Sequence, residues 1–270
     1  MRVQAVGAVA AVVAAMAVVA AAAPAPAVAA DAVPPDLMHD GAPLDPLCFD
    51  SWMDAPTVDV TTCGEADHII PVERGANAEA GWHGYTYRLA DLPEDAGIRG
   101  WVAWRYLGET EAGHVVETYH HGGGSGQFTD VQTVRRDGDR LHLVETHMGG
   151  DRCNGGVAAA AVAGGTVAGS VNITPYDLLA LALGEQDVPF EAYDDIASCA
   201  ICCVGKATFV GDDLAWVTLD PLEGGFAGPD DSGTPQACLD SLLRDSHRSL
   251  TAPELARLGR DVLARCAGGG

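Results

Sequence analysis

Short runs of β-branched and aromatic residues, separated by turn residues, fill the chain from Trp82 to about Asp220. Such runs predict strands, and we expect them at 82–88, 101–107, 114–121, 127–136, 139–147, 156–163, 166–173, 204–210 and 214–219. The dipeptides Asp137-Gly138, Asn154-Gly155 and Gly164-Gly165 have the chemistry of tight turns. Strands joined in this way form an antiparallel meander, closed as a barrel or stacked as a sandwich.

A different apolar spacing predicts helices. Thr174 can cap a helix that has Pro175 in its first turn and Gly184 after its end. The body of this helix is too apolar for a surface position, so it should cover a face or an open end of the sheet. Leucines near the C-terminus predict two more helices, and Thr251 with Glu254 forms a capping-box pattern at the start of the second. The expected fold class is α+β, predominantly an antiparallel β meander with one buried helix and a C-terminal helical hairpin.

The N-terminus has the layout of a secretory signal peptide. Arg2 precedes an Ala- and Val-rich run, and small residues then permit cleavage after Ala29 or Ala30. An uncleaved membrane anchor is the alternative, since about 20 apolar residues can span a bilayer. We expect cleavage, a periplasmic or extracellular location, and no membrane insertion of the mature chain. The expected organisation is a signal peptide at 1–30, an irregular Pro-rich segment at 31–81, the β core at 82–220, a linker at 221–233 and the hairpin at 234–270.

Eight cysteines follow the signal, and their number and the expected compartment together predict disulfides. They are Cys48, Cys63, Cys153, Cys199, Cys202, Cys203, Cys238 and Cys266. Closeness along the chain predicts the pair Cys48–Cys63, and the ends of the two C-terminal helices predict Cys238–Cys266. Adjacent Cys202 and Cys203 should have different partners, and we expect two bonds to tie the turn at 153 to the 199–203 segment.

The spacing of Cys199 and Cys202 also suggests two other uses. A dithiol redox site has this CxxC spacing, but it usually stands between a strand and a helix. A structural zinc site would need a second pair of ligands, and none follows. A structural disulfide is the favoured interpretation, and a thiol-redox protein is kept as one alternative function.

Charge narrows the range of partners. The chain has 15 Lys and Arg against 38 Asp and Glu, a formal net charge of −23. Such a surface repels phosphate backbones and anionic headgroups, so we expect no nucleic-acid partner. An unidentified small molecule or protein remains the expected partner. Aromatic residues concentrate in the first two strands, among them Trp82, Tyr85 and Trp104, where they serve either core packing or a sugar-binding platform.

One group of side chains could carry chemistry. If Asp137-Gly138 is a two-residue turn, Asp130 lies opposite Glu145 and Phe128 lies opposite His147. A five-residue loop at 122–126 would add His120 to the same sheet face. His120, Asp130, Glu145 and His147 could then hold a divalent metal or act as an acid and a base. The alternative is that these residues point into water near the strand ends, so no cofactor is firmly predicted.

The loop beside them is rich in glycine. Gly123, Gly124 and Ser125 form a flexible hairpin loop that could border a binding surface. The segment resembles neither a complete hydrolase nucleophile elbow nor a P-loop, because the required flanking residues are absent. Without a complete catalytic set, an enzyme is the less favoured interpretation. The predicted function is a disulfide-stabilised, secreted or periplasmic β-rich protein for binding or envelope structure; a metal-binding protein or metal-assisted hydrolase is the alternative.

Overall fold

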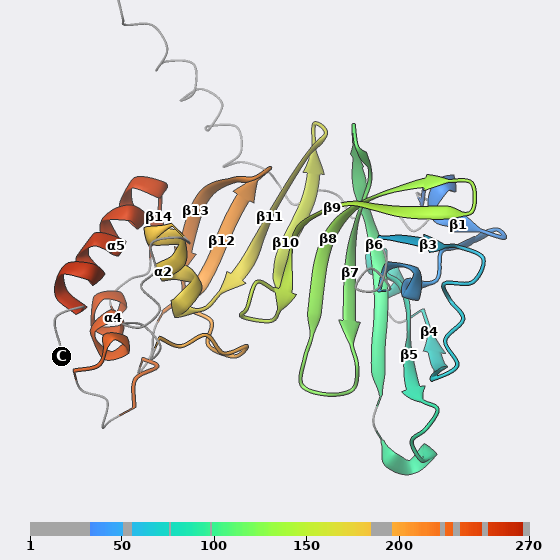
Figure 1. Cartoon of the computed structure of the whole chain (residues 1–270), viewed down its shortest axis with the longest axis horizontal. Helices are drawn as coiled ribbons and strands as arrows, with labels where there is room; N and C mark the ends of the chain where they lie inside the picture. Colours follow the sequence, from blue (N-terminus) through green and yellow to red (C-terminus); the bar gives the residue numbers. More distant parts are fainter. Residues whose placement is uncertain are drawn as a thin grey trace, which may run out of the picture.

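The structure is a computed structural model that describes residues 33–50, 56–75, 77–97, 99–184, 196–221, 225–228, 233–244 and 248–266. The predicted signal peptide lies outside these residues. Two antiparallel sheets of seven and five strands stand next to each other along the long axis of the molecule (Figure 1), with a small two-stranded ribbon at one end. The predicted α+β class with a predominantly antiparallel β structure is confirmed, and the single meander is divided between two sheets.

The seven-stranded sheet curls into a half-barrel with the order β3-β9-β8-β7-β6-β5-β4. Its strands are β3 (Thr57–Asp59), β4 (Ile69–Arg74), β5 (His83–Leu89), β6 (Gly100–Thr110), β7 (Gly113–His121), β8 (Phe128–Asp137) and β9 (Arg140–Asp151). The expectation of an irregular 31–81 segment was wrong for β3 and β4, which form the two edges of this sheet. Pro71 lies within β4, and an edge strand tolerates proline because one side of its backbone has no strand partner.

The N-terminal segment lies on the concave face of this sheet. It contains the 3₁₀ turn η2 (Pro35–Leu37), the ribbon strands β1 (Met38–His39) and β2 (Ala42–Pro43), and the 3₁₀ turn η3 (Pro46–Phe49). Phe49 packs against Trp104 with ring centroids 4.9 Å apart, and the Trp104 indole N–H donates to the Leu44 carbonyl at 2.8 Å. Because Trp104 is 0% exposed, it anchors the segment in the core of the half-barrel.

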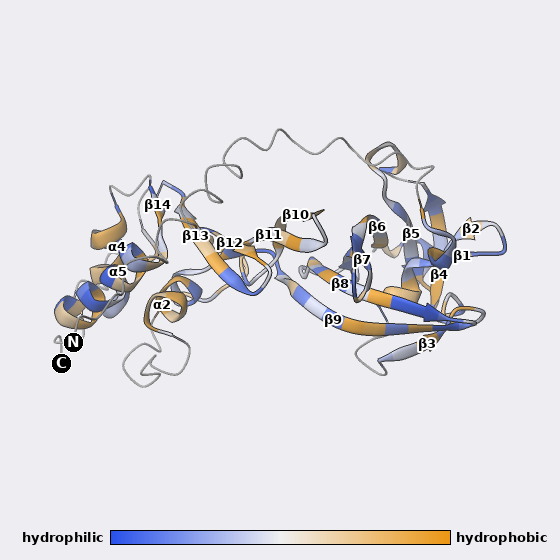
Figure 2. Cartoon of the chain, turned by 90° about the horizontal axis from the view of Figure 1, so that it is seen from above, coloured by the Kyte–Doolittle hydropathy of each residue, from blue (hydrophilic) through white to orange (hydrophobic). Residues whose placement is uncertain are grey.

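The five-stranded sheet and the helices build a second core. Its strands, in order, are β10 (Val157–Ala163), β11 (Thr166–Ile173), β12 (Gly205–Val210), β13 (Asp213–Leu219) and β14 (Ser249–Leu250). The helices are α2 (Pro175–Leu183), α4 (Pro235–Leu243) and α5 (Ala252–Cys266). Buried side chains of β11, β12 and β13 pack with those of all three helices in one cluster. Figure 2 marks the hydrophobic residues of these strands and helices in orange. The predicted buried helix and C-terminal hairpin are therefore confirmed.

The two sheets are connected by the polypeptide chain and also contact each other through buried apolar side chains. Val115 and Val131, from the convex face of the half-barrel, form a cluster with Val167 of β11. β10 approaches β6 so closely that a Cβ on Gly108 would come within 2.8 Å of the Val162 side chain, and Gly108 has a φ of +146°. Glycine is therefore required where the second sheet meets the first.

The residues that cap the helices, and the positions of the strands, were predicted correctly from the sequence. Thr174 and Asp177 form a capping box at the start of α2, with the Asp177 N–H 3.1 Å from the Thr174 hydroxyl. Thr251 donates its N–H to the Glu254 carboxylate at 2.8 Å before α5. All nine predicted strands are present, with ends that differ by a few residues.

Four disulfides join the eight cysteines. The predicted pairs Cys48–Cys63 and Cys238–Cys266 are confirmed. Cys202 and Cys203 have different partners, as expected, in the bonds Cys199–Cys202 and Cys153–Cys203. The expectation of two ties to the turn at 153 was wrong, because Cys199 and Cys202 pair within their own segment. Four disulfides are typical of an extracytoplasmic protein, and none of the described helices has the length and apolarity to cross a membrane.

Candidate functional site

The structure separates the four predicted site residues. Asp130 lies opposite Thr118, as expected, but its neighbour on β9 is Gly149, and Glu145 lies opposite Thr133. The predicted register was wrong because Asp137 pairs with Arg140, so that Gly138 and Asp139 form the turn, and because β9 contains two further register shifts.

Glu145 and His147 consequently lie on the other face of the sheet from Asp130. The His147 Nε2 atom is 2.7 Å from the Thr133 hydroxyl, and its Nδ1 atom is 3.7 Å from the Glu145 carboxylate. Thr133 and Asp130 are an odd number of positions apart on β8, so their side chains point to opposite faces. Within the described residues, no group of three or more His, Cys, Asp and Glu side chains is placed to hold a metal ion. The four residues do not form the metal site expected of them.

His120 and Asp130 share the concave face with a residue that the sequence did not indicate. This residue is Asp50, which directly follows η3. The His120 Nδ1 atom lies 3.1 Å from the Asp50 carboxylate, and the His120 Nε2 atom lies 3.1 Å from the Tyr87 hydroxyl. The hydrogen bond to Asp50 raises the pKa of His120, although burial opposes this effect. Burial, and then the Asp50 charge, raise the pKa of the Asp130 carboxyl. This polar cluster fastens the N-terminal segment to β5 and β7.

The cluster should make stability depend on pH. Because the folded-state pKa of His120 is raised, the ion pair with Asp50 contributes fully below the unfolded pKa of about 6.5 and is lost as pH rises through the folded value. We expect His120→Gln to cost about 0.5–1 kcal/mol at pH 5.5, since both partners are partly exposed, and less at pH 8.5. Denaturant unfolding at the two pH values measures this difference.

The neighbouring histidine supplies the control. His121 bonds the Gly124 carbonyl at 2.9 Å instead of a carboxylate. His121→Gln should therefore lack the pH-dependent loss expected of His120→Gln. Tyr87 also bonds His120, and Asp130 lies on the same face and interacts with Asp50, so the measurement is repeated in Asp130→Asn to remove the second carboxylate. Equal losses for His120→Gln at both pH values would contradict the proposed role of Asp50.

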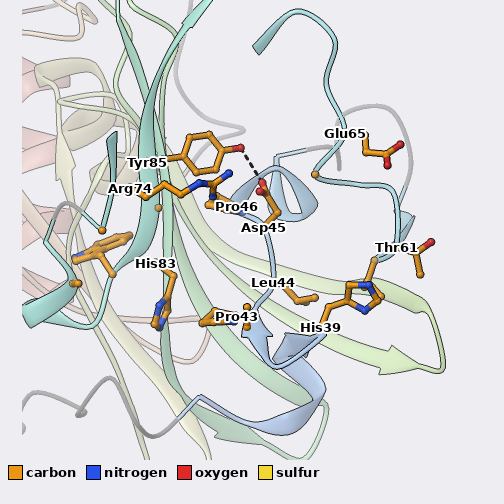
Figure 3. A pocket seen from close by; sticks show the side chains of 17 residues that line it. His39, Pro43, Leu44, Asp45, Pro46, Thr61, Glu65, Arg74, His83 and Tyr85 are labelled. Atoms are coloured by element: carbon orange, nitrogen blue, oxygen red, sulfur yellow. Dashed lines mark hydrogen bonds between the residues drawn. The ribbon is translucent and has the colours of Figure 1, made fainter. Parts of the chain in front are cut away.

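A cavity of about 480 Å³ opens between the N-terminal segment and the β4–β5 edge of the half-barrel (Figure 3). One wall comes from the ribbon and η3, with Pro43, Leu44 and Pro46. The opposite wall comes from β4 and β5 and the turn between them. The aromatic side chains of this wall are Trp82, His83 and Tyr85, and its charged group is Arg74. His39, Asp45, Thr61 and Glu65 line the cavity from segments that precede β4.

Hydrogen bonds fix the centre of this cavity. The Asp45 carboxylate accepts the Tyr85 hydroxyl at 2.9 Å and the Leu47 N–H at 3.1 Å. Burial is the main cause that raises the pKa of Tyr85, followed by the charge of Asp45, so Tyr85 stays protonated and donates. The His83 ring lies 5.1 Å from that of Trp104, and burial lowers the His83 pKa, which favours the neutral imidazole. The polar wall is therefore set before any ligand binds.

Arg74 is the cation of the cavity. Its guanidinium lies 4.8 Å from the centroid of the Tyr85 ring. None of the salt bridges between described residues involves Arg74, in a chain whose formal net charge is −23. Tyr85 orients the guanidinium by stacking, so its N–H donors can receive an anionic group.

The Gly-rich loop lies elsewhere. Gly123, Gly124 and Ser125 follow β7 in a bend, and none of them lines the cavity. Their predicted part in binding stays a prediction. The cavity was missed in the sequence because its walls come from segments far apart: Asp45 and Tyr85 are 40 residues apart. The only signal was the concentration of aromatic residues around Trp82 and Tyr85.

Fold and site together define a disulfide-rich, mainly antiparallel β protein with a preformed cavity beneath its N-terminal segment. Comparisons of the chain with protein-family models, with curated proteins and with solved structures found no significant match. The cavity and its side chains are therefore the basis on which function is argued.

Proposed function

We propose that the protein is an exported binding protein that holds a small ligand in the cavity between the N-terminal segment and the β4–β5 edge. The cavity itself carries this proposal. Its volume of about 480 Å³ lies within the range of about 300–1,000 Å³ that small-molecule sites occupy. Its walls combine apolar and aromatic surface with a few placed polar groups, which is the usual composition of such sites.

The N-terminal wall is held by covalent and packing contacts. The Cys48–Cys63 disulfide closes the segment that contains η3, and Cys48 is 1% exposed. Asp45 bonds Tyr85 across the cavity, and Trp104 bonds Leu44 below it. A wall fixed in this way reduces the entropy that ligand binding must otherwise overcome.

The charged groups suggest the class of ligand. Arg74 can receive a carboxylate in a bidentate geometry, and Pro43 and Leu44 offer apolar surface in the same cavity. Glu65, exposed at the rim, and Asp45 can accept hydrogen bonds from an ammonium group. A small zwitterion, an amino acid or a short peptide, matches this combination. A location outside the cytoplasm agrees with the four disulfides and with the N-terminal sequence.

Thermal-shift measurements with free amino acids at millimolar concentration test this proposal. At a concentration 100 times the Kd, a bound ligand stabilises the fold by about 2.7 kcal/mol, which is a shift of several degrees in Tm. We expect Arg74→Ala to abolish the shift, and Ala78→Trp to block the cavity from its exposed side.

Arg135→Ala is the matched control, because Arg135 is exposed on β8 of the same sheet and does not line the cavity. It should leave the ligand-induced shift unchanged. Absence of a shift with every amino acid and with short peptides would contradict the proposed ligand class. An equal shift in the wild type and in Ala78→Trp would contradict the proposed site.

A further inference from the structure

The Cys199–Cys202 disulfide differs from the other three in its surroundings. Each of the others has one cysteine that is nearly inaccessible: Cys48 is 1%, Cys153 5% and Cys266 6% exposed. Cys199 is exposed and Cys202 is partly exposed. Thiol–disulfide exchange requires that a thiolate reach a sulfur atom along the S–S axis. Among the four disulfides, only Cys199–Cys202 has no buried cysteine, so a thiolate can approach either of its sulfur atoms.

The same disulfide closes the shortest loop. Its cysteines are 3 residues apart, against 15, 28 and 50 for the other pairs. The stabilisation from a disulfide increases with the length of the loop that it closes. The segment 196–204 around it contains no helix or strand, so opening this bond breaks no regular element. Reduction should therefore cost the fold little.

We propose that Cys199–Cys202 is a thiol–disulfide exchange site that accepts two electrons from a dithiol partner. A partner thiolate attacks the exposed Cys199 sulfur, the S–S bond breaks, and Cys202 leaves as a thiolate. The second partner thiol then attacks the mixed disulfide and releases Cys199. The partner gains a disulfide, and two electrons and two protons pass to Cys199 and Cys202.

Two neighbouring features shape this site. Ile201, between the two cysteines, is 78% exposed and gives a docking partner an apolar contact. The Cys153 N–H donates to the Ala200 carbonyl at 3.2 Å, and Cys203 bonds Cys153, so the loop is held by the second disulfide when the first one opens. The strand β12, and not a helix, follows the pair. Because no helix N-terminus stabilises a thiolate here, the oxidised form is the resting state, and its reduction requires a partner dithiol of low reduction potential.

The test uses the whole oxidised protein with dithiothreitol and, separately, with reduced thioredoxin as a protein dithiol. Exchange is stopped by alkylation at set times, and the alkylated cysteines are identified by mass spectrometry. We expect Cys199 and Cys202 to be labelled at least tenfold faster than the other six cysteines, while the circular dichroism of the fold stays unchanged. Ile201→Ser should slow labelling by thioredoxin several-fold and leave labelling by dithiothreitol unchanged.

Two double variants complete the test. Cys199→Ala/Cys202→Ala should abolish the rapid labelling and lower Tm by only a few degrees. Cys238→Ala/Cys266→Ala removes a disulfide with a longer loop, so it should retain the rapid labelling and lose more stability. Labelling of all eight cysteines together, only on unfolding, would overturn the proposal, as would simultaneous opening of Cys153–Cys203. Neither result tests the ligand cavity, which lies between the N-terminal segment and the seven-stranded sheet.

Discussion

Trp104→Ala is expected to lower the free energy of unfolding by about 3–5 kcal/mol, the range for removing a large buried aromatic side chain. Trp104 is 0% exposed and contacts the rings of Phe49, at 4.9 Å, and His83, at 5.1 Å. Its indole N–H also bonds the Leu44 carbonyl at 2.8 Å. The substitution leaves a cavity, and it leaves that carbonyl without its donor.

The loss should reach the ligand site as well. Leu44 and His83 both line the cavity and both depend on Trp104 for their positions. Denaturant unfolding gives the stability, and the amino-acid thermal shift gives the state of the cavity. Trp104→Phe keeps the ring packing and loses the hydrogen bond, so it should cost less. Trp216→Ala, at a partly exposed position on β13, is the control; an equal loss in that variant would contradict the anchoring role of Trp104.

Local sequence determined most of the secondary structure. The alternation of β-branched residues located the nine strands, and the caps at Thr174 and Thr251 located the starts of α2 and α5. These features depend on neighbours a few residues away, so they can be read in order along the chain. The disulfide Cys48–Cys63 was predictable for the same reason, whereas Cys199–Cys202, whose cysteines are only 3 residues apart, was not predicted.

The site could not be predicted because it depends on register and on distant contacts. Asp137-Gly138 and Gly138-Asp139 both provide a turn with a glycine, and Gly138 adopts a φ of +58°. The change in the turn moves the register by two residues and keeps the faces, but the register shift between Leu143 and Glu145 moved Glu145 to the face opposite Asp130. The Asp50–His120 pair likewise joins residues 70 positions apart, and no local pattern indicates such a contact.

The second large effect is expected on the convex face, at an ion pair between the partly exposed Arg105 and the buried Glu117. The Arg105 guanidinium donates to the Glu117 carboxylate at 2.6 and 2.9 Å, and it lies 4.9 Å from the Trp82 ring centroid. The Glu117 side chain is only 7% exposed. Arg105→Ala would leave this carboxylate buried and unpaired, which should cost about 3–5 kcal/mol at neutral pH. Denaturant unfolding at pH 7 measures the loss.

The carboxylate, and not the arginine, is the source of that cost. Glu117→Gln removes the buried charge, so Arg105→Ala should cost far less in a Glu117→Gln background, and a double-mutant cycle isolates the difference.

The pH dependence supplies a second measurement of the same pair. Burial raises the pKa of Glu117 even beside Arg105, which acts to lower it; without the arginine, the folded-state pKa should rise further. A folded-state pKa above the unfolded value of about 4.3 means that folding takes up a proton, so stability falls as pH rises through that window. Arg105→Ala should therefore recover part of its loss when the pH is lowered from 8 to 5. A loss that is the same at both pH values, or that persists in the Glu117→Gln background, would show that Arg105 stabilises the sheet through its packing on Trp82 and not through the buried charge.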